Sequence, residues 1–193
     1  MKRRILLLPL AALIIASLCV WRITHPRVGS DAIMSPSLRP APGFELYNQN
    51  SVNVRLERYL GRHAIALIFF AGESGAESVP EISRFVGLEQ ELIAEDAIVI
   101  GISRNLPQDH EKSFRSMLPD GRISSRQIQL VSDLTGSVHR TWGLPEELRG
   151  NERRVFLIDR AGRVGYTAGR PAEERDFEVL LNNLLGRSKT ADR

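Results

Sequence analysis

Apolar residues follow two different spacings along most of this chain, and the two spacings alternate. Residues 64–70 and 97–102 form continuous apolar runs, which are typical of strands buried on both faces of a sheet. Shorter strand patterns cover residues 52–56, 128–131, 154–159 and 163–167. Helical spacing covers residues 55–61, 78–94, 107–118, 132–142 and 171–185. This order of elements predicts an α/β fold in which helices cover both faces of a mixed central sheet.

A different pattern occupies the N-terminus. Residues 5–21 contain no charged side chain, follow Lys2, Arg3 and Arg4, and are closed by Arg22. A run of this length is at the lower end of the range for a membrane-spanning helix, and the alternative is a cleaved signal peptide. We favour a retained transmembrane helix, because no good small-x-small cleavage site follows the run. The basic residues before it predict a single-pass protein whose C-terminal domain lies outside the cytoplasm, on the periplasmic or extracellular face.

These patterns divide the chain into four parts. Residues 1–23 are the predicted membrane anchor or signal peptide, 24–41 a Pro-rich linker, 42–187 the globular domain and 188–193 a C-terminal tail. The prolines, glycines and serines of the linker predict a semi-extended tether rather than a regular element.

Charge is distributed unevenly between these parts. The chain has a net charge of +3, but five of its 26 Lys and Arg residues and none of its 23 Asp and Glu residues lie within residues 1–30. Residues 31–193 therefore have a net charge of −2, and we expect no nucleic-acid partner. The single cysteine, Cys19, lies in the apolar run, where we interpret it as a lipid-facing side chain. Because the domain has no cysteine for a disulfide, a packed core must stabilise it.

No cofactor or metal is predicted from the domain sequence. Gly72, Gly75 and Gly87 match neither a dinucleotide-binding fingerprint nor a P-loop. Glu73 and Glu77 could form a pair of acids for catalysis or a metal, but no histidine is close in sequence. We interpret both as solvated acids near a helix start, where the helix dipole favours them.

Five stretches of the domain resemble those of a known family. They are residues 41–46 (APGFEL), residues 64–70 followed by Glu81, residues 98–103 (IVIGIS), residues 130–133 with 142–144 (LVSD and WGL), and residues 153–164 (RRVFLIDRAGRV). In this order, residues 42–185 resemble the redoxin branch of the thioredoxin superfamily, the alkyl hydroperoxide reductase and thiol-specific antioxidant group that includes the peroxiredoxins. The resemblance implies a thioredoxin-like fold and thiol-dependent peroxide reduction or disulfide exchange.

The active-site turn of that family is changed in this chain. The peroxiredoxin pattern Pro-x-x-x-Thr-x-x-Cys overlays without gaps on Ala71, Gly75 and Ser78, and the Cys-x-x-Cys pattern of other members overlays on Gly75 and Ser78. Arg153 stands where the resemblance places an arginine that stabilises the thiolate and the peroxide. The chain therefore resembles a family member whose active-site cysteines are missing.

A serine does not simply replace a thiolate, because its hydroxyl is not ionised near neutral pH. No nucleophile-elbow pattern surrounds Ser78, and we predict that Ser78 is a helix N-cap in a capping box with Glu81. For Arg153 an anion site and a solvated edge both remain open, whereas for Arg149 and Arg154 we favour the solvated edge.

Two further side chains are assigned to the structure of the domain rather than to a site. His139 is predicted to be a surface or half-buried residue, and Trp142 a core residue.

Three functions of different classes remain open. We favour a membrane-anchored, exported redoxin-fold domain that has lost thiol catalysis and acts as a binding or assembly module for an envelope protein. The second is the thiol-dependent oxidoreductase or peroxidase, an antioxidant enzyme, that the resemblance implies. The third is an anion or small-molecule binder at the groove around Gly75, Ser78 and Arg153. The sequence leaves residual activity, the partner or ligand, and the oligomeric state open.

Overall fold

The computed structural model describes residues 39–118, 125–169 and 174–186. The predicted anchor, residues 1–23, the predicted tail, 188–193, and most of the predicted linker lie outside the described residues. Within the described ranges, no helix is both long enough and apolar enough to cross a membrane.

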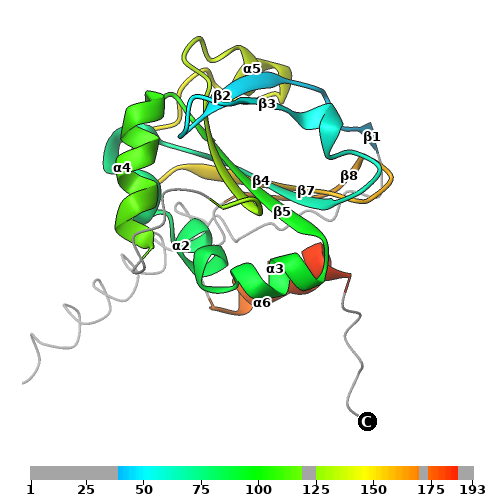
Figure 1. The fold of residues 1–193 in the computed structure, drawn as a ribbon. Coiled ribbons are helices and arrows are strands. Elements are labelled where there is room, and N and C mark those ends of the chain that lie inside the picture. The colour runs from blue at the N-terminus through cyan, green and yellow to red at the C-terminus, as the bar shows by residue number, and fades with distance from the viewer. Residues whose placement is uncertain (1–38, 119–124, 170–173, 187–193) are drawn as a thin grey trace, which may run out of the picture. The chain divides into compact units, whose positions relative to one another are not determined.

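A mixed sheet of eight strands forms the centre of the domain (Figure 1). Its strands are β1 (Arg39–Pro40), β2 (Glu45–Asn48), β3 (Asn53–Arg55), β4 (Ala64–Phe70), β5 (Ala97–Ser103), β6 (Ile128–Ser132), β7 (Arg153–Ile158) and β8 (Arg163–Gly169). Their spatial order is β1-β8-β7-β4-β5-β6-β2-β3. β4, β5 and β6 pair in parallel, and every other neighbouring pair is antiparallel. The predicted mixed α/β sheet is confirmed.

Helices and short 3-10 helices connect the strands. They are η1 (Leu56–Arg58), η2 (Gly72–Ser74), η3 (Ala76–Ser78), α2 (Pro80–Gly87), α3 (Glu89–Ala94), α4 (Pro107–Met117), α5 (Ser137–Thr141) and α6 (Glu174–Leu185). Figure 1 shows α2, α3 and α6 on one side of the sheet and α5 on the other. Helices therefore cover both faces, as predicted.

The central strand β4 contributes to two hydrophobic cores, one on each face of the sheet. Its alternate residues Ala64, Ala66, Ile68 and Phe70 join the core that α2, α3, α4 and α6 cover. Its other residues, Ile65, Leu67 and Phe69, join a second core with Val138 and Trp142. The side chain of Trp142 is 2% exposed, so its assignment to the core is confirmed. Because all seven residues of β4 are buried, the sequence shows one unbroken apolar run.

Three sequence predictions about elements are wrong in detail. The segment read as a tether already contains strand β1, which pairs with β8. The helix predicted over residues 78–94 is two helices, because the backbone of Leu88 leaves the helical region at φ −106° and ψ 19°. The helix predicted over residues 132–142 begins only at Ser137, after Gly136 adopts a left-handed φ of 69°.

Candidate functional site

The turn between β4 and α2 is the place at which the family resemblance expects a reactive thiol. It consists of the two 3-10 helices η2 and η3, joined by Gly75. Gly75 has φ 75° and ψ 164°, a conformation that essentially only glycine adopts. The Gly75 N–H donates to Gly72 O at 3.2 Å, and the Ser78 N–H donates to Gly75 O at 3.3 Å. The turn is therefore a defined backbone structure built around one glycine.

Neighbouring segments hold this turn in place. The Asn105 side chain, just after β5, donates to Gly72 O at 2.9 Å. From α4, the Ser113 hydroxyl oxygen accepts a hydrogen bond from the Ala76 N–H at 3.3 Å. A Cβ atom at Gly72 would lie 1.9 Å from Asn105 Oδ1, so a larger residue there would displace the Asn105 side chain. The segment after β5 and helix α4 therefore both hold the turn in place.

Ser78 does not have the role predicted for it. The capping box is wrong, because helix α2 begins at Pro80 with Val79 as its N-cap and makes no side-chain cap hydrogen bond. The exposed Ser78 hydroxyl instead donates to Gly75 O at 2.8 Å. The carboxylate of Glu81 accepts a hydrogen bond from Arg153.

Arg153 and Glu81 form a buried ion pair behind the turn. Antiparallel pairing of β7 with β4 sets Arg153 opposite Phe70, the last residue before the turn. The Arg153 Nε lies 3.0 Å from Glu81 Oε1 and 2.9 Å from Oε2. Arg153 is 9% exposed and Glu81 is 2% exposed. Burial raises the pKa of the Glu81 carboxyl, and the charge of Arg153 only partly opposes that effect.

A small cavity lies beside Ser78 and Arg153. It has a volume of about 20 Å³, and its lining includes Ala71, Ser78, Glu152 and Arg153. That space suits a single water molecule. Of the residues predicted for the site, Ala71, Ser78 and Arg153 line this cavity. Gly75 does not line it, but its carbonyl oxygen accepts a hydrogen bond from the Ser78 hydroxyl.

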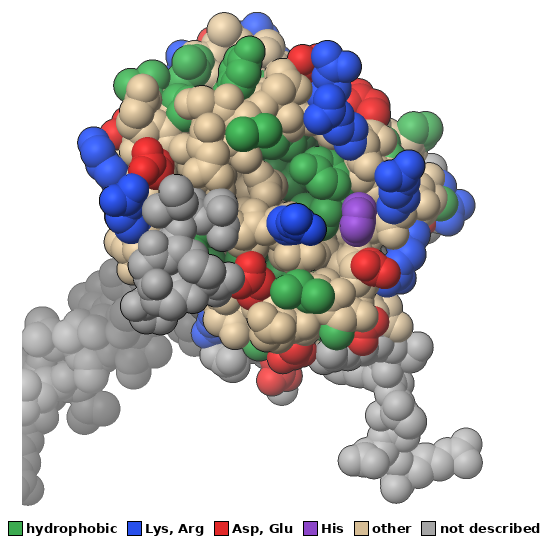
Figure 2. All heavy atoms as spheres, in the orientation of Figure 1, with side chains coloured by type: hydrophobic (Ala, Val, Ile, Leu, Met, Phe, Trp, Pro, Cys, Tyr) green, Lys and Arg blue, Asp and Glu red, His purple; other side chains and the backbone are tan. Residues whose placement is uncertain are grey.

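The other charged residues weighed for the site do not line the cavity. Glu73 and Glu77 are exposed, as predicted, although they belong to η2 and η3 rather than to α2. Arg149 is exposed, and Arg154 is half-buried with its guanidinium donating to Arg153 O at 2.9 Å. On the face shown in Figure 2, basic and acidic side chains are interspersed rather than gathered by sign.

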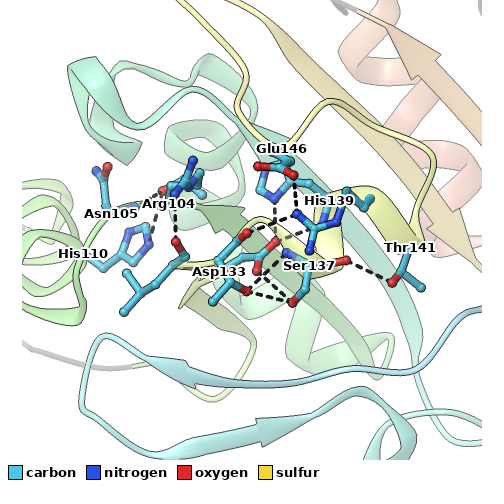
Figure 3. A network of polar contacts seen from close by, with 12 residues as sticks. Arg104, Asn105, His110, Asp133, Ser137, His139, Thr141 and Glu146 are labelled. Atoms are coloured by element: carbon cyan, nitrogen blue, oxygen red, sulfur yellow. Dashed lines mark hydrogen bonds and ion pairs between the residues drawn. The ribbon is translucent and has the colours of Figure 1, made fainter.

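A buried acid and imidazole form a second polar cluster that sequence reasoning missed. Asp133 Oδ2 accepts hydrogen bonds from the His139 backbone N–H at 2.9 Å and from its ring Nδ1 at 2.8 Å (Figure 3). The prediction that His139 is at the surface or half-buried is wrong, since it is 1% exposed and packs edge-on against Phe69. Burial would raise the pKa of Asp133, but the hydrogen bonds from His139 outweigh it and lower that pKa. This pair links the start of the loop after β6 to helix α5.

His110 on α4 is a third buried polar residue. Its Nε2 lies 3.4 Å from the Ser103 hydroxyl, and its ring stacks edge-on against Phe70. Burial lowers the pKa of His110 to about 4, so the ring is neutral at physiological pH. The spacing of His110, Ser113 and Phe114 on one helix face is the sequence signal for this burial.

No described residues form a cluster of three or more His, Cys, Asp or Glu side chains suited to a metal ion. The Ser78 hydroxyl, the buried Glu81 carboxylate and the buried Arg153 guanidinium lie at or behind the turn.

The chain is similar to known proteins in both sequence and fold. The model of the AhpC/TSA family matches residues 38–167. The chain is 26% identical over 157 residues to the chloroplastic 2-Cys peroxiredoxin BAS1 of Hordeum vulgare, covering 77% of this chain and 67% of that protein. The chain spans between about half and two thirds of the length of the first curated relatives that it matches.

Solved structures show the same fold. Peroxidoxin BcpB from Mycobacterium tuberculosis matches with a TM-score of 0.61 at 21% identity, covering 77% of this chain and 93% of that chain. BsSco, a member of the Sco family of cytochrome c oxidase assembly proteins, matches with a TM-score of 0.57 at 16% identity, covering 80% and 96%. The thioredoxin-like fold that the resemblance implies is confirmed.

Proposed function

The chain belongs to the AhpC/TSA family, and from this premise we propose that it is a membrane-anchored, exported redoxin-fold domain that has lost thiol catalysis. In this proposal the domain acts as a binding or assembly module for an envelope protein. The observation that carries the proposal is the hydroxyl of Ser78 at the position of the reactive thiol, donating to Gly75 O at 2.8 Å. Within the residues that the structure describes, this hydroxyl makes no hydrogen bond to an imidazole or a carboxylate that could activate it.

The thiol-dependent oxidoreductase or peroxidase is the weaker alternative. Peroxide reduction and disulfide exchange both begin with a thiolate, and the domain has no cysteine. The arginine that would stabilise the thiolate is Arg153, which pairs with the Glu81 carboxylate. Without the thiolate, this pair has a structural role in linking β7 to α2.

The anion or small-molecule binder is disfavoured by the same geometry. A cavity of about 20 Å³ is far smaller than the roughly 300 Å³ of a typical small-molecule site. An incoming anion would also have to compete with Glu81 for the Arg153 guanidinium. A ligand that raises the thermal midpoint of the wild type but not of Arg153→Ala would favour this alternative over the binding module.

The shared fold and the apolar N-terminal run support an assembly role at a membrane. BsSco, with which this chain shares the fold, belongs to a family of cytochrome c oxidase assembly proteins. The apolar run of residues 5–21 supports attachment to a membrane, because its length reaches the lower limit for a spanning helix. A domain held at the membrane surface by a short linker meets other envelope proteins at a high effective concentration.

Loss of catalysis is tested with hydrogen peroxide and a dithiol reductant in a stopped-flow assay of the full chain. We expect consumption of peroxide at the rate of buffer alone. The matched control is Cys19→Ser, which removes the only thiol of the chain. Turnover above background by the wild type would contradict the proposal. Its loss in Cys19→Ser would assign that turnover to the Cys19 thiol, and its persistence in Cys19→Ser would assign it to another group.

Attachment and partnership are tested in membranes. The full chain should stay in the pellet after carbonate extraction, whereas a variant that lacks residues 1–23 should be released. Affinity purification of the full chain from detergent-solubilised membranes should retain a specific envelope protein. Recovery of the chain alone, after mild crosslinking as well as without it, would contradict the assembly role.

A further inference from the structure

A larger cleft lies at the end of the sheet opposite the turn. Its volume is about 300 Å³, and its lining comes from the start of β4, the β7–β8 hairpin and the end of α6. Ala64, the first residue of β4, lines the cleft, whereas the turn follows the last of the seven residues of this strand, about 20 Å away. This volume reaches the lower limit for sites that bind small molecules.

Two glycines leave room for the cleft. The register between β7 and β8 shifts after Leu157, so that Gly165 is an extra residue with no opposite residue on β7. Gly186 directly follows the last residue of α6. Both glycines line the cleft, and neither places a side chain in it.

The buried part of the lining is apolar. Ala64, Leu157 and Leu184 line the cleft and belong to the core that α6 covers. Helix α6 contacts both β4 and β7, so core packing holds these side chains in place. A ligand that covers them gains from the burial of apolar surface.

Arg160 gives one end of the cleft a positive charge. This exposed residue lines the cleft from the β7–β8 hairpin, and its Nη2 donates to the Glu95 backbone oxygen at 2.7 Å. Because that acceptor is neutral, the bond orients the guanidinium and leaves its charge in place. The neighbouring carboxylate of Asp159 is paired with Arg163, whose Nε donates to Asp159 Oδ2 at 3.0 Å.

The other end of the cleft has the opposite polarity. Leu184 and Gly186 line it at the C-terminus of α6, where helix carbonyl groups carry partial negative charge. An anionic group is therefore disfavoured beside α6 and favoured at Arg160. An anionic ligand would thus direct its charged end to the hairpin and its apolar part to α6.

We propose that this cleft binds a small aliphatic carboxylate, with its carboxylate at Arg160 and its alkyl chain against the apolar lining. A volume of about 300 Å³ holds about ten non-hydrogen atoms at about 30 Å³ each. A planar guanidinium matches the geometry of a carboxylate. The inference goes beyond the proposed function, because binding at this end of the sheet does not depend on the chemistry of the turn.

The experiment titrates the isotope-labelled full chain in maltoside micelles with hexanoate and follows the backbone amide signals of Arg160 and Gly165. Hexanamide has the size of hexanoate without its charge and also controls for partition into the micelles. Acetate has the charge without the chain. Hexanoate should give saturable shifts with a Kd at least about tenfold lower than that of hexanamide, for lack of charge, or of acetate, for lack of apolar contact.

Arg160→Gln should raise the Kd of hexanoate about tenfold and leave that of hexanamide unchanged. The matched control is Arg58→Gln, which removes the same charge from an exposed position outside the lining of the cleft. In this control the Kd of hexanoate should stay at the wild-type value.

Several results would overturn the proposal. One is the absence of saturable shifts with hexanoate, and another is an equal Kd for hexanoate and hexanamide. Acetate that binds as tightly as hexanoate would reduce the site to an ion on Arg160. An equal effect of the two arginine substitutions would assign binding to the overall charge of the domain. Should Arg160→Gln fail to fold, the three ligands compared on the wild type decide the question.

Discussion

At the scale of single residues, Glu81 and Arg153 determine what the turn can do. Each belongs to a different element, and the β4–β7 register brings them together. The positive charge of Arg153, which would stabilise a thiolate or an anion, is paired with the Glu81 carboxylate. The carboxylate also depends on the guanidinium, because desolvation already raises the pKa of Glu81. A buried ion pair of this kind tolerates joint replacement better than loss of one member.

We therefore predict strong coupling between these two positions. Glu81→Met and Arg153→Met should each lower the free energy of unfolding by about 3–5 kcal/mol, because a single change leaves a charge buried without this partner. The double variant should lose much less than the sum, since two apolar side chains fill similar space. Urea denaturation of the four proteins measures the cycle, and additive losses would show that the pair is not coupled.

At the scale of elements, the conformation of Gly75 restricts which residue can stand at this point of the turn. The resemblance overlays a threonine on Gly75, but φ 75° with ψ 164° is strained for a β-branched residue. A threonine would therefore not fit the turn in this conformation.

Gly75→Ala should lower the free energy of unfolding by about 1–3 kcal/mol, because alanine is strained in this conformation. Gly87→Ala is the matched control. Gly87 ends α2 at a negative φ, and a Cβ there meets no atom within 4 Å. The control should be neutral or slightly stabilising in the same chemical denaturation assay. Equal losses in both variants would contradict the strain at Gly75.

The elements of the domain differ in how far the sequence predicts them. The strands β4 and β5 were predictable because burial on both faces leaves continuous apolar runs. The late start of α5 was not, because the left-handed φ of Gly136 leaves no mark on hydrophobic spacing. Side-chain contacts that depend on strand register could not be predicted from the sequence. Glu81 fits a capping box by sequence, and only the β4–β7 pairing reveals Arg153 as its partner.

At the scale of the whole molecule, buried ionisable groups link stability to pH. His110 lies in the core that the helices α2, α3, α4 and α6 cover, next to Phe70, and burial lowers its pKa to about 4 against the opposing charge of Asp109. An unfolded histidine has a pKa of about 6.5. Between these values the unfolded chain binds a proton that the folded domain excludes. Stability from this group is therefore present above pH 6.5 and is lost as the pH falls toward 4.

His110→Gln should flatten this dependence. The free energy of unfolding of the wild type should fall by on the order of 3 kcal/mol between about pH 6.5 and pH 4 on account of His110. In the variant this component is absent, although its stability at neutral pH can differ. Denaturation midpoints measured across this range give both slopes, and parallel slopes would contradict the buried neutral histidine.

The order of strands in the sheet also has a consequence for the time at which the domain can fold. The central strand β4 bonds to β5, which follows soon after it, and to β7, which is made near the end of the domain. During synthesis, the β7 side of β4 therefore stays without its partner until almost the whole domain has emerged. Folding of this chain should be a late event, and a stalled or shortened chain that ends before Arg153 would expose an aggregation-prone apolar strand.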